Sequence, residues 1–207
     1  MDAKLLAWAR AEMRRRGQSS DLPPLWLFTD ARRLADPRPA VARLPKGLAG
    51  VVLRHDGETS RAVLGRDLAR LCRARRLRLV VAGDARLAAA LGAGVHLRGG
   101  RRPAGGPAGG PVVTRRRGAL LTSSAHSLVE LRRAARVGVD LVFLSPAFAT
   151  RSHLGEAALG PLRWARMARG VAVAVAALGG VGGASVRRLP RGLCCGVGAI
   201  EALGGGR

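Results

Sequence analysis

The sequence has 207 residues, of which 48% are hydrophobic and 24% are charged, and its formal net charge is +23. This length favours one domain, spanning residues 1–207, with a core of its own, and the hydrophobic share excludes wholesale disorder. The three cysteines are an odd number without metal-ligand spacing, which favours a reducing, cytoplasmic environment over a secreted disulfide scaffold. No apolar stretch is long enough for a membrane span, and the N-terminal segment lacks the pattern of a signal peptide.

The positive charge comes almost entirely from arginine, because Lys4 and Lys46 are the only lysines. Such usage is typical of a GC-rich genome, which explains the choice of arginine over lysine but not the scarcity of acids. The excess predicts a positive surface potential that attracts phosphate groups of metabolites or of nucleic acid. The chain has no set of aromatic side chains suited to base stacking, so we expect only weak, non-specific, salt-sensitive binding to nucleic acid.

Helix-like and strand-like segments alternate along the chain. A helix is expected first, at 3–16, where it could close the bottom of a barrel. Short apolar runs, typical of strands covered on both faces, follow at 25–30, 50–55, 78–83, 94–99, 119–125, 139–147, 171–181 and 192–200. Helical periodicity predicts helices at 60–75, 85–91, 127–137 and 159–169, and Ser127 with Glu130 has the pattern of a capping box. In the last run, Cys194 and Cys195 are expected to face opposite sides of the strand.

Eight strands that alternate with helices predict an α/β fold, a compact TIM (β/α)8 barrel. A flavodoxin-like or Rossmann sheet is the alternative, but it would need fewer strands, and no GxGxxG pattern follows the first run. The segment 98–118 is rich in Gly, Pro and Arg, and its prolines exclude an ordinary helix. We expect a degenerate fourth helix there, replaced by a flexible surface loop, with a mobile lid or a nucleic-acid-binding arm as alternatives.

The active site of such a barrel lies at the carboxyl ends of its strands. Gly179 and Gly180 end the seventh run, and Gly198 ends the eighth. Loops after these two strands commonly bind phosphate in barrels, because glycine lets the backbone approach the ligand closely and a helix N-terminus offers free N–H groups. The sequence therefore predicts a phosphate site at these glycines.

Three motifs give the chain a likeness to a known family. They are the Ser124-Ala125-His126 stretch, the Ser-Pro-x-Phe-x-Thr stretch from Ser145 to Thr150, and Gly-Gly-Val at 179–181. Together with segments 83–97 and 123–168, they resemble the thiamine phosphate synthase/TenI family. The resemblance implies a TIM barrel that binds a thiazole phosphate, held by backbone amides at Gly180 and Gly198 and near the segment 145–150. Ser124, Arg151, His153 and Gly179 are further expected contacts of the substrate.

The family contains two kinds of enzyme, and the resemblance implies different residues for each. The synthases join a pyrimidine diphosphate to thiazole phosphate with Mg²⁺, which needs carboxylate ligands. Of the family's metal-binding pattern only Asp84 remains, and Arg101 stands about where the second carboxylate is expected. Asp84 is therefore either a remaining metal ligand or only the N-cap of the helix that follows it. His153 stands where the family pattern has a lysine.

The TenI-type members are thiazole tautomerases, which transfer protons and so suit a histidine. The resemblance assigns this part to His126, and the alternative is that His126 only caps the loop before its helix. We narrowly prefer a TenI-like protein, with a Mg²⁺-dependent synthase, a non-catalytic phosphate binder and a nucleic-acid binder as alternatives. His96 and His55 are expected to be packed rather than catalytic. The sequence leaves the oligomeric state open, and a homo-oligomer is compatible with it.

Overall fold

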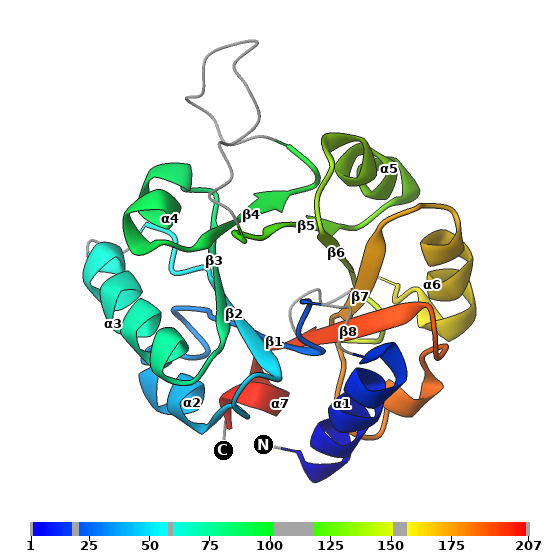
Figure 1. Cartoon of the computed structure of the whole chain (residues 1–207). Helices are drawn as coiled ribbons and strands as arrows, with labels where there is room; N and C mark the ends of the chain where they lie inside the picture. The colour runs from blue at the N-terminus through cyan, green and yellow to red at the C-terminus, as the bar shows by residue number, and fades with distance from the viewer. Residues whose placement is uncertain (1, 18–20, 58–59, 102–117, 151–156, 206–207) are drawn as a thin grey trace.

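The computed structural model describes residues 2–17, 21–57, 60–101, 118–150 and 157–205. Their strands are all parallel and form one closed barrel in chain order, from β1 to β8, with helices around it (Figure 1). The strands are β1 (Leu25–Phe28), β2 (Ala49–Leu53), β3 (Arg78–Ala82), β4 (Gly94–Arg98), β5 (Leu121–Ala125), β6 (Leu141–Leu144), β7 (Ala174–Leu178) and β8 (Cys194–Ala199). The predicted barrel and all eight predicted strands are confirmed, and the pairing of β1 with β8 excludes an open sheet.

The helices form the outer layer of the barrel (Figure 1). They are α1 (Ala3–Arg16), α2 (Arg38–Arg43), α3 (Arg61–Ala74), α4 (Ala85–Leu91), α5 (Leu128–Val137), α6 (Gly160–Arg169) and α7 (Glu201–Gly204), with a short 3-10 helix, η3 (Val186–Arg188), between β7 and β8. The described residues between β4 and β5, at 99–101 and 118–120, contain no helix, and the rest of the predicted loop lies outside the described residues. In the described part of the chain, no helix is long and apolar enough to cross a membrane.

Aromatic rings fill the interior of the barrel. Phe143 meets the rings of Trp26 and Phe28 edge to face, at centroid distances of 5.4 Å and 4.8 Å. A Cβ atom at Gly50, on the neighbouring strand, would overlap the Trp26 ring, so glycine makes room for the indole. A second and larger apolar layer packs between the outer faces of the strands and the helices. Cys194 belongs to this outer layer and Cys195 packs against the interior cluster, as predicted for adjacent residues of one strand.

The prediction that the first helix closes the bottom of the barrel is wrong. The helix α1 lies in the outer ring beside β8 (Figure 1), and its buried Leu5 and Ala9 belong to the outer apolar layer. Only the short η3 separates β7 from β8, so the outer face of β8 is left for α1 to cover. Leu22, between α1 and β1, is one of the partly buried residues that pack against the interior aromatic cluster.

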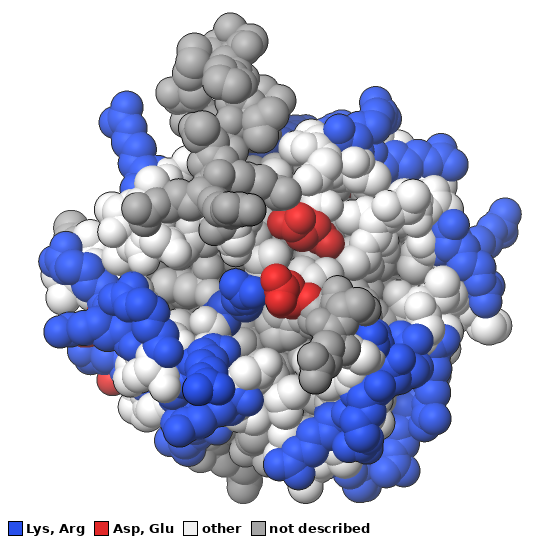
Figure 2. Space-filling model, viewed as in Figure 1, with Lys and Arg blue, Asp and Glu red and all other residues white. Residues whose placement is uncertain are grey.

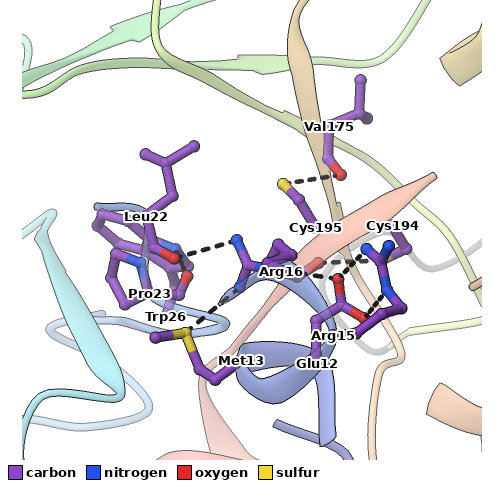
Figure 3. A network of polar contacts seen from close by, with 11 residues as sticks. Glu12, Met13, Arg15, Arg16, Leu22, Pro23, Trp26, Val175, Cys194 and Cys195 are labelled. Carbon is purple, nitrogen blue, oxygen red and sulfur yellow. Dashed lines mark hydrogen bonds and ion pairs between the residues drawn. The ribbon is translucent and has the colours of Figure 1, made fainter. Parts of the chain in front are cut away.

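A buried ion-pair network fixes α1 to the segment that leads into β1 (Figure 3). The Glu12 side chain is only 4% exposed and lies 2.6 Å from Arg15 Nη2 and 3.4 Å from Arg16 Nε. Arg16 Nη1 also donates to the carbonyl oxygen of Leu22 at 3.1 Å. A charge buried in this way is tolerated because it is paired and hydrogen-bonded. The network therefore holds the outer helix and the backbone of Leu22 in one arrangement.

The basic side chains are distributed around the outside of the barrel. Figure 2 shows Lys and Arg over the helices at the rim of this face, whereas acidic patches lie near its centre. On this face the basic side chains thus lie over many elements, as expected from the scatter of the arginines along the sequence. Such a distribution gives a general positive field rather than one docking face on the side in view.

Candidate functional site

A cavity of about 1100 Å³ opens at the carboxyl ends of the strands. Its wall includes residues from the ends of β1, β2 and β4–β8 and from the loops that follow them. Most of the predicted site residues line it, namely Ser124, His126, Ser145, Thr150, Gly179, Gly180 and Gly198. The predicted contacts Arg151 and His153 lie outside the described residues. The fold thus brings together motifs that are separated by more than 50 residues in the sequence.

The glycines after β7 and β8 let the backbone line the cavity closely. Gly180 has a φ of +63°, which disfavours any residue with a side chain. A Cβ atom there would overlap the carbonyl oxygen of Ala149 and would lie 2.7 Å from that of Phe148. At Gly198 a Cβ would lie 2.7 Å from the Phe28 ring. Both positions therefore require glycine for steric reasons, and both present main chain to the cavity.

Asp2 joins the start of α1 to the glycine loop after β7, a contact that sequence reasoning missed. Its Oδ1 accepts from the N–H of Lys4 at 2.8 Å, and its Oδ2 accepts from the N–H of Gly183 at 2.8 Å. Burial raises the pKa of Asp2, but the hydrogen bonds from Gly183, Lys4 and Leu5 and the Lys4 charge outweigh it and hold the pKa below the ordinary value. Asp before a helix is a sequence signal for an N-cap, but the second contact, with Gly183, has no local signal.

His126 lines the cavity from the turn between β5 and α5. Ser127 caps α5 by accepting from the Glu130 N–H at 3.2 Å, as predicted. The Glu130 carboxylate does not complete the usual capping box, because its Oε2 accepts from the N–H of His126 at 2.7 Å. The backbone of His126 is therefore fixed by the same residue that begins the helix.

Two other histidines are packed, as predicted. His96 is 2% exposed, and its Nδ1 lies 2.9 Å from Thr122 Oγ1. Burial, with smaller contributions from the charges of Arg54 and Arg98, lowers the pKa of His96 to about 3, so its ring is neutral at physiological pH. His55 is also buried and lies 2.9 Å from Thr29 Oγ1, which fixes the end of β1 against the end of β2.

Among the residues that the structure describes, four arginines line the cavity, and the sequence did not reveal them as a group. They are Arg33, Arg54, Arg98 and Arg101. Two of them, Arg54 and Arg98, lie at strand ends, and this position was the only sign in the sequence that they could reach the site. Asp30 pairs with Arg33 at 3.2 Å, and Asp56 pairs with Arg98. Of the residues that the structure describes, the acids that line the cavity itself are Asp2, Glu130 and Glu201.

The family model described as TMP-TENI, thiamine monophosphate synthase, matches residues 27–203. The chain belongs to the thiamine phosphate synthase/TenI family. The match confirms the family resemblance that the sequence motifs indicated, and it extends over most of the chain. Members of this family are enzymes of thiamine biosynthesis.

This chain is similar in sequence to one curated protein and in fold to solved structures. A thiamine biosynthesis bifunctional protein, ThiED, from Geobacter sulfurreducens is 32% identical over 171 residues, 78% of this chain, and the match spans about a third (33%) of that relative's length. A thiamine phosphate pyrophosphorylase from Pyrococcus furiosus has a TM-score of 0.66 at 23% identity, with 87% of each chain covered. An HpcH/HpaI aldolase/citrate lyase family protein from Burkholderia cenocepacia has a TM-score of 0.60 at 17% identity, covering 93% of this chain and 92% of its own.

The described residues of this thiamine phosphate synthase/TenI chain do not form the carboxylate set that Mg²⁺ prefers. Asp84 caps α4, because its Oδ1 accepts from the N–H of Leu87 at 2.8 Å, and it does not line the cavity. No group of three His, Cys, Asp or Glu side chains in the described part of the chain is placed to hold a metal ion. Arg101 lines the cavity where the family pattern has a carboxylate, and a guanidinium cannot ligate Mg²⁺.

Proposed function

We propose that this chain binds a thiazole phosphate and catalyses proton transfer of the TenI type. One observation carries the proposal: His126 and the glycine loops after β7 and β8 line the same cavity. Glycine main chain provides close approach for a phosphate, and histidine provides a proton acceptor and donor at neutral pH. The two chemical needs of a thiazole phosphate tautomerase are thus supported at one place.

The phosphate end of the substrate would lie between the loops of β7 and β8. Gly180 and Gly198 are candidates for backbone contacts, and Ser145 and Thr150 line the same cavity. The first N–H groups of α7, which follows β8 directly, have no partner within their own helix. Neutral and backbone donors of this kind hold a phosphate without a metal ion.

His126 would serve as the general base and acid. In the proposed reaction it removes a proton from one position of the thiazole ring system and returns a proton at another, so that the double bond moves into the ring. The hydrogen bond from its N–H to Glu130 fixes the backbone from which the imidazole projects. A base held in position transfers protons faster than a mobile one, because the reacting atoms must lie within hydrogen-bond distance.

The synthase reaction is the second candidate, favoured by the description of the matching family model as thiamine monophosphate synthase. It needs Mg²⁺ to neutralise the diphosphate leaving group, and the donor set described above does not provide a carboxylate pair. The preference for proton transfer rests on this difference in donors. As an enzyme of small-molecule biosynthesis, the chain is proposed to act in the cytoplasm, with thiazole phosphate as its principal partner.

The test compares both reactions on the same purified protein. We expect conversion of the thiazole phosphate carboxylate tautomer to the aromatic form, followed by NMR, and a loss of at least about 100-fold in kcat for His126→Asn. Thiazole phosphate binding, measured by calorimetry, should stay within about twofold in the variant, because His126 is not assigned to the phosphate. Asp84→Asn is the matched control and should leave kcat unchanged.

Formation of thiamine phosphate from the pyrimidine diphosphate, abolished by chelator and by Asp84→Asn, would contradict the proposal and establish a synthase. Binding of thiazole phosphate without turnover in either assay would reject catalysis and leave a phosphate-ligand binder. Absence of thiazole phosphate binding would reject both the substrate and the site.

A further inference from the structure

The four cavity arginines come from three separate parts of the barrel. Arg33 follows β1, Arg54 follows β2, and Arg98 and Arg101 belong to the end of β4 and the turn after it. Asp30 and Asp56 each pair with one member, so the cluster keeps an excess of positive charge. Like charges repel at short range, so the part of the wall that these arginines form favours an anionic ligand, although Asp2, Glu130 and Glu201 add negative charge to the same cavity.

Arg54 is the member whose surroundings point most clearly to a ligand. Its N–H donates to Thr29 Oγ1 at 2.9 Å, which fixes its backbone. Its guanidinium forms no hydrogen bond or ion pair with the other residues that the structure describes. Burial lowers the pKa of Arg54, and the charges of Arg98 and Arg33 add to this, while Asp30 and Asp56 oppose it. A half-buried guanidinium among other cations is stabilised by an anion that enters the cavity.

The turn that carries Arg98 and Arg101 is held on three sides. The N–H of Gly100 donates to Ser123 Oγ at 3.0 Å, and Arg133 Nη1 donates to the carbonyl oxygen of Gly99 at 3.2 Å. The N–H of Arg101 donates to the carbonyl oxygen of Arg98 at 2.9 Å and closes the turn. The two arginines therefore project from a fixed backbone, which reduces the entropy lost when they bind a ligand.

Arg98 and Arg101 lie across the barrel from the glycine loop after β8, whereas Arg33 follows β1, which pairs with β8. In a closed barrel ordered β1 to β8, β4 stands opposite β8, so Arg98 and Gly198 occupy opposite walls. The cavity volume of about 1100 Å³ is slightly above the usual range for small-molecule sites. There is thus room for a ligand with an anionic group at each end, or for two anionic ligands side by side.

We propose that Arg33, Arg54, Arg98 and Arg101 form a second oxyanion subsite, which binds a substrate carboxylate or a diphosphate group through guanidinium groups without a divalent metal ion. Guanidinium forks match the paired oxygens of both groups. This inference rests on the proposed function, because the glycine loops take the first phosphate. It adds that the ligand of this cavity carries a second oxyanion, and that arginine replaces the metal in holding it.

The experiment measures binding by calorimetry in buffer with EDTA, using inorganic diphosphate and, separately, thiazole phosphate with and without its carboxylate. We expect diphosphate to bind in EDTA, with affinity lowered at least about tenfold by Arg54→Gln. The matched control is Arg66→Gln, an exposed arginine of α3 outside the cavity, with an expected change below about twofold. If the natural oxyanion is a carboxylate, Arg54→Gln also removes the preference for the carboxylated thiazole; if it is a diphosphate, that preference is unchanged.

Diphosphate binding that requires Mg²⁺ would overturn the inference, as would equal losses in Arg54→Gln and Arg66→Gln, which would indicate general surface charge. Absence of diphosphate binding in a protein that still binds thiazole phosphate would reject this subsite and leave the proposed function intact. If the unaltered protein does not bind thiazole phosphate at all, the proposed function is rejected instead. Circular dichroism of Arg54→Gln separates a binding defect from a folding defect, and Arg98→Gln provides an independent second variant.

Discussion

Replacing Gly180 by alanine should destabilise the protein and weaken its binding of thiazole phosphate. The left-handed backbone, with φ of +63°, costs a residue with a Cβ atom about 1–2 kcal/mol. The new methyl group would meet carbonyl oxygens of Ala149 and Phe148, the latter at 2.7 Å, and such overpacking costs about 1–3 kcal/mol. The two contributions give a loss of roughly 2–5 kcal/mol in the free energy of unfolding.

Thermal unfolding by circular dichroism measures this loss directly. For a chain of this size each kcal/mol corresponds to about 2–4 °C, so a loss of about 3 kcal/mol lowers Tm by roughly 6–12 °C. Gly182→Ala is the matched control, because it lies in the same loop, has no positive φ and would meet nothing within 4 Å. A Tm for Gly180→Ala within about 1 °C of the unaltered protein would show that the loop does not adopt this conformation and would refute the reasoning.

Three further outcomes follow from buried groups. Glu12→Gln leaves the Arg16 charge without its carboxylate and should cost about 3–5 kcal/mol in urea unfolding; Asp21→Asn, at a side chain that is 86% exposed, should cost less than about 1 kcal/mol, and equal effects would contradict the account. His96 has its pKa lowered from 6.5 to about 3, so the unfolded chain takes up the proton first as pH falls. Stability is thus lost below about pH 6.5, by about 1.4 kcal/mol at pH 5.5; His96→Asn should reduce that dependence, and an unchanged slope would refute it. Burial raises the pKa of Cys72 and Cys194 to about 12, and both side chains are buried, so Ellman's reagent should label these two only after unfolding, and rapid labelling of either in the native protein would contradict their burial.

The barrel itself was predictable because its signal is local. A strand covered on both faces must be apolar throughout, and runs such as Leu25–Phe28 and Leu141–Leu144 are fully buried in the structure. The Ser127 cap and the glycine C-cap at Gly138 bound α5 by equally local chemistry. The position of α1 was not predictable in the same way, because an amphipathic pattern says which face is buried but not against which strand.

The candidate site was only partly predictable, for the same reason. Gly180, Gly198 and His126 carry local patterns that mark turns and strand ends. The arginine cluster depends on the meeting of residues from the ends of β1, β2 and β4, and no single window of the sequence contains it. The sequence left two roles open for Asp84, a metal ligand or a helix cap. The structure shows the cap, because the Asp84 carboxylate accepts a hydrogen bond from the Leu87 N–H.

The contact between Asp2 and Gly183 has a practical consequence for anyone who handles this protein. Any polypeptide joined ahead of Asp2 would emerge at the cavity rim, beside the glycine loop after β7. A purification tag or fusion partner in that position would compete with the helix cap for space and would crowd the entrance used by ligands. Assays of binding and turnover are therefore best made on protein from which any N-terminal tag has been removed.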